Sequence, residues 1–385
     1  MIILRLLEIA PYFPPHVGGV ERYVFSISKY LVKRGHEVCV LTSNLPKTKN
    51  MERINGVDVF RLNGVEVLGD PITWGIIKKL RTLTRRVDIV VTHGYPFSMN
   101  YLVATTRNLF ISSFPRLVFT FHGYGFRDGS KDYLLRRARD ILLLKSIMNN
   151  NDAIISLTHH DKELLYKYFC PRNKRIFVIP NGVQVNEYDR HKISSGLITK
   201  IKERTQNRPI ILFIGRLSEE KRPQFLLRAA KNLFPDLKPV IIFIGDGPLR
   251  PRLIQIRKEL ALEDDVLLTG HVTEQLKRAF LSASDLVVLP SLFEGMPTVL
   301  LEAMASRKPI VATRIPGVAE IVEDGINGFL IDKNSFEELA EKVRFLLEDQ
   351  SLARKMGEKG RKIAEENYDW KGIVRRMEYV FKQVI

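Results

Sequence analysis

The sequence predicts an α/β protein with two Rossmann-like, doubly wound parallel-sheet domains. Length is the first reason, because 385 residues exceed what one ordinary core organises. The second is alternation, since in both halves short apolar runs typical of buried strands are separated by segments with helical spacing. The third is that glycine-rich turns follow several of these runs, where open parallel sheets bind their ligands. An apolar content of 45% agrees with globular domains.

The first half begins with an apolar strand over residues 2–10 and a turn rich in proline and glycine. Gly18 and Gly19 in this turn would allow the backbone to approach a ligand closely. A helix follows from Glu21 to Arg34, with Gly35 placed to end it. Neither the GxGxxG fingerprint of dinucleotide-binding proteins nor a P-loop follows the strand, which argues against a simple dehydrogenase or a P-loop ATPase. Further strands are expected at 36–43, 57–62, 87–94, 116–123 and 175–183, with another strand and a helix between 153 and 169.

Two of these strands end in a histidine, His93 and His122. Ligands of open parallel sheets sit beyond the carboxyl ends of strands, so both are site candidates. The alternative for each is a structural histidine that only satisfies a hydrogen bond.

The second half restarts the alternation after a polar connection with a short helix, residues 185–208. Its first strand, within 208–216, ends at Arg216, and a loop leads to Lys221. Two cations at a strand's carboxyl end could neutralise a diphosphate, Arg216 as a planar fork and Lys221 as a point charge. Further strands are expected at 239–245, 265–272, 285–290, 309–313 and 327–331.

The stretch 285–302 combines a buried strand, a turn and a helix whose first residue is expected to be Pro297. Glu294 would lie in the loop at the strand's end, and Glu302 one to two turns into the helix. Free N–H groups near Gly295, Met296 and Thr298 could hold a phosphate, while both carboxylates accept from ligand hydroxyls. The alternative is a solvated surface loop with two unrelated acids. The chain then closes with a helical segment that we expect to be interrupted at Gly357 and Gly360.

Charge is uneven along the chain. The net charge is +17, of which residues 1–184 carry +13 and residues 185–385 carry +4. The excess positive charge suggests that the first half binds an anionic partner, and nucleic acid and an anionic lipid surface both fit. The alternative is a generally basic surface without a partner. The helices expected at 74–86 and 131–148 are basic and amphipathic; most such helices pack on a sheet, and an interfacial helix is the alternative.

Compartment and membrane signals are weak. Cys39 and Cys170 are the two cysteines and lie far apart, which gives neither a disulfide framework nor a metal cluster and fits a reducing compartment. The first 15 residues are too short and too charged for a signal peptide or a span. No stretch reaches about 18 uninterrupted apolar residues, so no integral membrane protein is expected.

The chain resembles the retaining nucleotide-sugar glycosyltransferases of family 4, also called glycosyl transferases group 1, which have the two-domain GT-B architecture. The resemblance is carried, in the family's order along nearly the whole chain, by GGVER (18–22), TFHG (120–123), IPNGV (179–183), GRLSEEK (215–221), GDGP (245–248) and EGMPTVLLE (294–302). The last motif holds the family's pair of glutamates separated by seven residues. One departure is Arg222-Pro223 after Lys221, where the family often has glycine.

The resemblance implies two Rossmann-like domains facing a deep cleft. Residues 1–184 would bind the acceptor and residues 185–368 the nucleotide-sugar donor, with a last helix, 369–385, packing back on the first domain. In the donor domain, Arg216 and Lys221 would bind the diphosphate and Glu294 and Glu302 the sugar and ribose hydroxyls. In the first domain, the loop of Gly18 and Gly19 would approach the diphosphate and His122 the transferred sugar. The catalytic set would be His122, Glu294, Arg216 and Lys221, and the donor-binding set Gly18, Gly19, Arg216, Lys221, Glu294, Gly295, Met296, Pro297, Thr298 and Glu302.

We therefore expect a cytoplasmic hexosyltransferase that takes a UDP- or GDP-sugar and a hydroxyl acceptor, such as a lipid-linked or polysaccharide one, with retention of configuration. No DxD-type acid pair is present, so no metal or other cofactor is expected, and cations and helix N-termini would stabilise the leaving diphosphate. Peripheral docking on the inner face of an anionic membrane is a further expectation. One alternative is a nucleotide-sugar epimerase of the same fold. The other is a basic nucleic-acid-binding protein, for which the chain lacks a recognition motif, so no nucleic-acid partner is expected.

Overall fold

The computed structural model of the protein describes residues 2–16, 18–67, 69–94, 98–109, 114–123, 142–169, 175–233 and 236–385. The chain forms two compact units: unit 1 comprises Met1–Asn181 and Trp370–Ile385, and unit 2 comprises Gly182–Asp369. The domain boundaries proposed from the sequence lie after residues 184 and 368, a few residues from these. Most of the helix expected at 131–148 lies outside the described residues, of which 142–149 are helical.

Unit 1 contains an eight-stranded sheet in the order β10-β9-β8-β7-β1-β2-β4-β3. Its pairs are parallel except β3 with β4, an antiparallel edge that the sequence did not reveal. The chain moves outward from β1 through β2 and β4, then returns to β7 on the other side, so the strand order reverses between β1 and β7. The strands are β1 Arg5–Ile9, β2 Glu37–Ser43, β3 Met51–Ile54, β4 Val57–Leu62, β7 Ile89–Gly94, β8 Arg116–Phe121, β9 Ala153–Ser156 and β10 Ile176–Val178.

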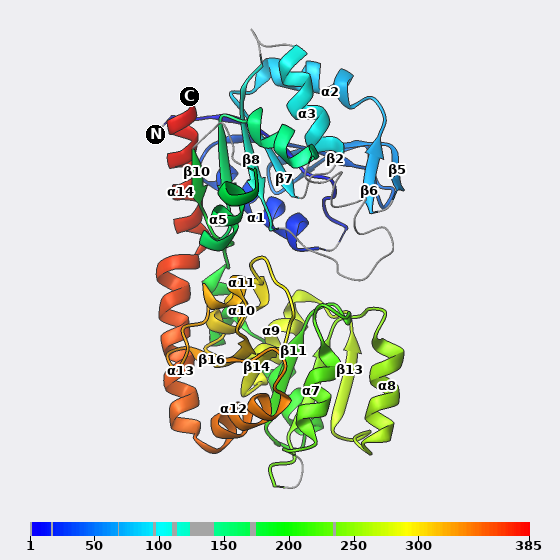
Figure 1. Ribbon diagram of the computed structural model, residues 1–385, viewed down its shortest axis with the longest axis vertical. Coiled ribbons are helices and arrows are strands. Elements are labelled where there is room, and N and C mark those ends of the chain that lie inside the picture. Colours follow the sequence, from blue (N-terminus) through cyan, green and yellow to red (C-terminus); the bar gives the residue numbers. More distant parts are fainter. Residues whose placement is uncertain are drawn as a thin grey trace. The chain divides into compact units, whose positions relative to one another are not determined.

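The helices of unit 1 cover this sheet, and the last of them, α14, comes from the end of the chain (red in Figure 1). Trp370 at its start packs against Tyr23 and Tyr30 of α1, with ring centroids 5.5 and 6.2 Å apart. Glu378 further along α14 accepts hydrogen bonds from Arg34 and from buried His36. The helices are α1 Gly19–Lys33, α2 Ile76–Leu83 with a 3₁₀ turn Thr84–Arg86, α3 Ser98–Leu109, α5 His159–Phe169 and α14 Trp370–Val384.

A separate two-stranded hairpin, β5 Gly64–Val67 and β6 Asp70–Thr73, interrupts unit 1 after β4. It was not predicted, and neither was α3, because neither segment has a long apolar pattern. Val65 pairs with Ile72, and both side chains are exposed together with Val67. The hairpin therefore presents apolar side chains to solvent.

Unit 2 contains a six-stranded sheet, parallel throughout, in the order β13-β12-β11-β14-β15-β16. This is the strand order 3-2-1-4-5-6 of the Rossmann fold, with its reversal between β11 and β14. Apolar runs such as Ile210–Ile214 are buried because helices cover both faces of a parallel sheet (Figure 1). The strands are β11 Ile210–Ile214, β12 Val240–Ile244, β13 Val266–Gly270, β14 Leu286–Leu289, β15 Ile310–Thr313 and β16 Gly328–Ile331.

The connection before β11 belongs to unit 2 and is less exposed than expected. It forms the 3₁₀ turns Val185–Tyr188 and Arg190–Lys192 and the helix α6 Ser195–Arg204, and buries Val185, Tyr188 and Ile193. The remaining helices of unit 2 are α7 Pro223–Ala230, α8 Arg250–Glu259, α9 Glu274–Ala283, α10 Thr298–Ala305, α11 Pro316–Ala319, α12 Phe336–Glu348 and α13 Gln350–Ile363.

The expected interruption at Gly357 and Gly360 is wrong, because α13 continues through both glycines. A Cβ at Gly357 would lie 2.1 Å from the carbonyl oxygen of Arg307, and one at Gly360 would lie 3.3 Å from the Met304 side chain. The glycines thus let α13 pack closely against α10 and its end. The helical segment is instead interrupted at Asp349, between α12 and α13, and a π-helical turn, Ala364–Tyr368, follows α13.

Candidate functional site

Two loops meet where the strand order of unit 2 reverses. One follows β11 and carries Arg216 and Lys221, and the other follows β14 and carries Glu294. The backbone N–H of Leu292 donates to the carbonyl of Glu220 at 2.8 Å, which joins the two loops. This is the position at which doubly wound sheets bind ligands.

Lys221 and Glu294 form an ion pair across these loops. The Lys221 Nζ lies 2.6 Å from both carboxylate oxygens, and the Ser291 hydroxyl donates to Oε1 at 2.7 Å. The Glu294 side chain is 6% exposed and that of Lys221 is 23% exposed. An ammonium has three N–H donors, so one remains for a ligand after Glu294 takes two. The sequence predicted both residues, but it did not predict that they pair with each other.

Arg222 explains the departure from the family's glycine. It has φ 49° and ψ 48°, a left-handed conformation that glycine adopts without steric cost. Its guanidinium lies 3.9 Å from the ring centre of Phe225. The loop therefore keeps the backbone conformation that suits glycine, with an arginine in its place.

Arg216 follows the end of β11 directly and is exposed. Within the part of the chain that the structure describes, its guanidinium makes no hydrogen bond or ion pair. The backbone beneath it is held by the GDGP turn, since a Cβ at Gly245 would lie 2.1 Å from the Gly215 carbonyl and one at Gly247 2.5 Å from that of Leu217. The GDGP motif is thus explained by close packing of two loops, with Arg216 held above them.

The turn from Glu294 to Thr298 leads into α10, which begins one residue later than expected. Pro297 is the N-cap rather than the first helical residue, and no side chain caps the helix. Met296 and Pro297 are buried, whereas Glu294, Gly295 and Thr298 are partly exposed. A Cβ at Gly317 would lie 2.0 Å from the Gly295 carbonyl oxygen, so α11 packs directly on this turn. Sequence reasoning missed Gly317, although it follows a proline in a strand-to-helix turn.

Glu302 lies in the second turn of α10 and is 6% exposed. Its Oε1 accepts from the Nζ of Lys277 at 2.7 Å, and Lys277, itself 5% exposed, also contacts Glu274 at 2.9 Å. Lys277 was missed by sequence reasoning. The available signal was a lysine at the position that continues the apolar stripe of α9 with Phe280.

Of the two glycines in the loop before α1, packing within the protein accounts for Gly18 but not for Gly19. Gly18 is the N-cap of α1, and a Cβ there would lie 2.1 Å from a carboxylate oxygen of Glu21, which folds back over it. Gly19 is exposed, and a Cβ there would meet no atom within 4 Å. Glu21 also lies 3.1 Å from the Nδ1 of His16.

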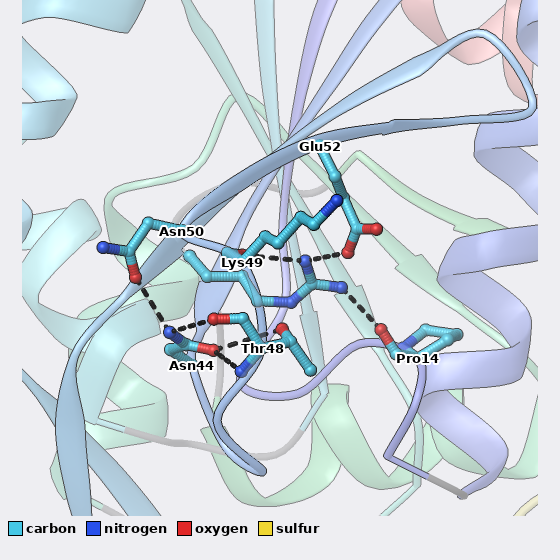
Figure 2. A network of polar contacts seen from close by, with 7 residues as sticks. Pro14, Asn44, Thr48, Lys49, Asn50 and Glu52 are labelled. Carbon is cyan, nitrogen blue, oxygen red and sulfur yellow. Dashed lines mark hydrogen bonds and ion pairs between the residues drawn. The ribbon is translucent and has the colours of Figure 1, made fainter.

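The start of this loop is braced by β2 and β4. Arg61, buried in β4, donates to the carbonyl of Pro14 at 2.6 Å and to that of Lys49 at 3.3 Å, and also binds Glu52. Figure 2 shows this network and the adjoining turn, in which Asn44 bonds Thr48 and Asn50. These hydrogen bonds thus fix the start of the glycine loop beside the reversal point of the first sheet.

A buried cluster lies where β1, β7 and β8 end; we call Glu8, Tyr23, His93 and His122 the histidine cluster. His93 Nε2 binds the Glu8 carboxylate, and His93 Nδ1 lies 3.4 Å from His122 Nε2. Glu8 and His93 have no exposed surface. The Tyr23 ring packs edge-on against His122, with centroids 4.7 Å apart.

The two histidines predicted as site candidates therefore lie in different environments. His93 lies inside β7 and serves Glu8 and His122, whereas His122 follows β8 and is partly exposed. Burial, and then the electrostatic influence of His93, lower the pKa of His122 well below its ordinary value. Glu8 was missed; the available signal was an acid within a strand expected to be buried on both faces.

Comparison with known proteins matches one family model to each half of the chain. The family model "Glycosyltransferase Family 4" matches residues 17–187, and "Glycosyl transferases group 1" matches residues 197–363. An uncharacterized glycosyltransferase of Methanocaldococcus jannaschii is 28% identical, over 99% of each chain. The UDP-Gal:alpha-D-GlcNAc-diphosphoundecaprenol alpha-1,3-galactosyltransferase of Escherichia coli is 30% identical, over 69% of this chain and 68% of the relative.

Among solved structures, Anabaena Alr3699/HepE in complex with UDP superposes with a TM-score of 0.80 at 21% identity, covering 99% of this chain and 100% of that one. Among the described residues, no helix combines the length and hydropathy needed to cross a bilayer. The strand orders, the loops at both reversal points and the two family matches lead to one assignment: the chain belongs to glycosyltransferase family 4 and is a glycosyltransferase with the GT-B fold.

Proposed function

We propose that the protein transfers a hexose from a nucleoside-diphosphate sugar, UDP- or GDP-linked, to a hydroxyl acceptor with retention of anomeric configuration. The observation that carries the proposal is the pair of cations at the reversal point of unit 2: exposed Arg216, and Lys221 with a donor left over after binding Glu294. The name of the E. coli relative describes a UDP-galactose donor, and the HepE structures contain UDP or UDP-glucose. Both support this donor class.

In the proposed reaction the bond between the anomeric carbon and the diphosphate oxygen breaks, and its electron pair leaves with the diphosphate. The acceptor oxygen forms the new bond on the same face of the sugar, and its proton passes to the departing phosphate oxygen. Arg216 and Lys221 stabilise the charge that develops on the diphosphate, assisted by the N–H groups of Gly295, Met296 and Thr298.

The other polar residues bind the donor in this proposal. Glu294 accepts from hydroxyls of the transferred sugar, and Glu302 from those of the ribose, because each carboxylate oxygen can accept more than one hydrogen bond. In unit 1, Gly19 contacts the diphosphate, since no neighbour within the protein accounts for a glycine there. His122 contacts the transferred sugar.

A thermal-shift comparison of UDP, GDP, UDP-glucose and GDP-mannose tests donor binding. We expect one nucleotide series to raise the melting temperature of the wild type and to lose most of this effect in Arg216→Ala. Turnover of the best binder, with and without candidate acceptors, then tests the reaction. A new sugar nucleotide formed without any acceptor would assign the epimerase alternative instead, and the anomeric coupling of the glycoside product would test retention.

We further propose that no metal ion or other cofactor takes part, because Arg216 and Lys221 supply two cations at the proposed diphosphate position. Turnover should be the same after exhaustive dialysis against EDTA as after addition of Mg²⁺ or Mn²⁺. Activity that disappears with EDTA and returns with either ion would refute this part of the proposal.

The acceptor is proposed to be lipid-linked and presented at an anionic membrane on the cytoplasmic side. Unit 1 exposes apolar side chains on the β5–β6 hairpin and on the neighbouring Trp74, which is 58% exposed, while α2 exposes Lys78 and Arg81. Apolar anchors beside cations suit the interface of an anionic bilayer. The name of the E. coli relative includes a diphosphoundecaprenol substrate, which supports this acceptor class.

Vesicle sedimentation tests membrane docking directly. Binding should be stronger to phosphatidylglycerol-containing vesicles than to phosphatidylcholine vesicles at low salt, and Trp74→Ala should weaken it. Equal binding to both vesicle types would end the membrane proposal without affecting the proposed reaction.

A further inference from the structure

The histidine cluster contains a buried acid that the proposed chemistry does not use. Glu8 lies in the middle of β1 with no exposed surface, and its Oε1 has no hydrogen-bond partner among the described residues. Its Oε2 binds His93 Nε2. A buried carboxylate is costly unless a positive partner balances it, and His93 is the basic group that contacts it in the described part of the chain.

With Glu8 ionised, the contacts leave two arrangements of protons. An ionised carboxylate only accepts, so His93 Nε2 carries a proton in both. If His93 is neutral, its Nδ1 accepts from His122 Nε2–H, and the Nδ1 of His122 is a bare lone pair. If His93 is a cation, its Nδ1–H donates to His122 Nε2 across the 3.4 Å contact, and His122 carries its proton on Nδ1.

Charge balance decides between the two. The cationic form of His93 compensates the enclosed carboxylate, whereas the neutral form leaves a buried negative charge with a single neutral donor. His122 itself stays neutral, because burial and the positive charge of His93 lower its pKa well below the ordinary value. The ring of Tyr23 packs edge-on against His122 and restricts its rotation.

We propose that Glu8, acting through His93, is a positioning residue that holds His122 as the Nδ1–H tautomer. Within the described residues the Nδ1 of His122 makes no hydrogen bond, so this N–H is a donor prepared before the substrate arrives. Resting on the proposed function, the inference assigns it a sugar oxygen as acceptor. A donor fixed in advance costs no reorganisation on binding.

The tautomers can be read directly without any substrate. A long-range ¹H–¹⁵N spectrum of protein labelled with ¹⁵N-histidine distinguishes Nδ1–H, Nε2–H and doubly protonated rings, and loss of signals in His93→Gln and His122→Gln assigns them. We expect the wild type to show a doubly protonated His93 and an Nδ1–H His122. An Nε2–H His122 in the wild type would overturn the proposal, whether or not any variant folds.

Glu8→Gln provides the second readout, because glutamine has the same shape and can still accept from His93 Nε2–H. Without the carboxylate, His93 should become neutral and His122 should change to the Nε2–H form. Asp88→Asn is the matched control, since it removes another carboxylate of unit 1 that pairs with Arg5 at the opposite end of β7. An unchanged spectrum in Glu8→Gln, or the same change in Asp88→Asn, would contradict the assignment.

Activity separates this inference from the proposed function. With a UDP- or GDP-sugar that turns over, Glu8→Gln should lower kcat about tenfold or more while KM for the donor stays within about twofold. A protein that transfers no sugar but shows the expected tautomers would refute the function and leave the positioning role intact. Normal tautomers with unchanged kcat in Glu8→Gln would remove the link to the reaction.

Discussion

The two sheets have the same strand order at their reversal points but place their charges differently. In unit 2 the Lys221–Glu294 pair lies on loops beyond the strands and retains contact with solvent through Lys221. In unit 1 the charged pair Glu8–His93 lies within the strands and has no exposed surface. The histidine after β8 is the group of this cluster that reaches outward.

This difference separates two ways in which a parallel sheet supports a site. Loop charges can exchange one partner for a ligand, because solvent and flexible side chains compensate the change. Strand charges cannot exchange partners without burying an unpaired ion, so they serve to orient a neighbouring group. The following predictions test this contrast, beginning with the largest expected effect.

Lys277→Met should destabilise unit 2 by about 3–5 kcal/mol, because the buried Glu302 carboxylate would lose its ammonium partner. Urea unfolding monitored by circular dichroism measures the loss. The double variant Lys277→Met/Glu302→Gln should recover most of it, since both charges are then gone. Equal losses in the single and double variants would show that the loss comes from Lys277 itself and not from the buried carboxylate, which would weaken the contrast.

Lys221→Ala should lower kcat about 100- to 1,000-fold, because one of the two cations at the proposed diphosphate position is removed. Its melting temperature should fall as well, since the buried Glu294 carboxylate, 6% exposed, loses its ammonium partner. Lys231→Ala, an exposed lysine after α7, is the control and should leave both quantities unchanged. Steady-state kinetics with the best donor checks this, and wild-type kcat in Lys221→Ala would remove the loop cations from the mechanism.

Gly19→Ala should weaken donor use about 10- to 100-fold without loss of stability, since the added methyl meets no atom of the protein. Gly18→Ala is the matched variant, and it should instead displace the Glu21 carboxylate and cost about 1 kcal/mol of stability. Donor titration and thermal unfolding of both variants test the pair. Equal donor affinity in Gly19→Ala and the wild type would show that this glycine has no ligand-binding role.

The smallest expected effect is the contribution of Glu378 to the stability of unit 1, which depends on pH. Burial alone would raise the pKa of Glu378, but hydrogen bonds from Arg34 and His36 outweigh it and lower the pKa below 4.5. The stability that this carboxylate contributes is therefore complete above about pH 4.5 and is lost as pH falls through the lowered pKa. Unfolding of unit 1, followed by Trp370 fluorescence in a Trp74→Phe background, should lose less stability between pH 6 and 3 in Glu378→Gln than in the wild type.

Much of this molecule could be predicted from residue patterns. The apolar runs identified the parallel strands because buried strands and helices differ in length and spacing. The motifs predicted Arg216, Lys221, Glu294 and His122 as site residues, and their roles stay a prediction. The hairpin β5–β6 and the edge strand β3 were missed because their patterns are too short. Lys277 and Glu8 were missed for another reason: a charge inside an apolar pattern acquires its meaning only from a partner brought in by tertiary packing.

The glycines show the same limit. Gly357 and Gly360 were taken as helix breakers, the usual effect of glycine in an isolated helix. Tertiary packing reverses this effect, because the Arg307 carbonyl and the Met304 side chain occupy the space that side chains at these positions would need. A sequence cannot show that neighbour.

The path of the chain has a consequence for domain exchange. The polypeptide passes between the units twice, after Asn181 and after Asp369, and returns in α14 to the unit that began it. A chimera that takes unit 1 from one parent must therefore take the last sixteen residues from that parent too. Otherwise Trp370 and Glu378 would meet foreign surfaces in place of Tyr23, Tyr30, Arg34 and His36.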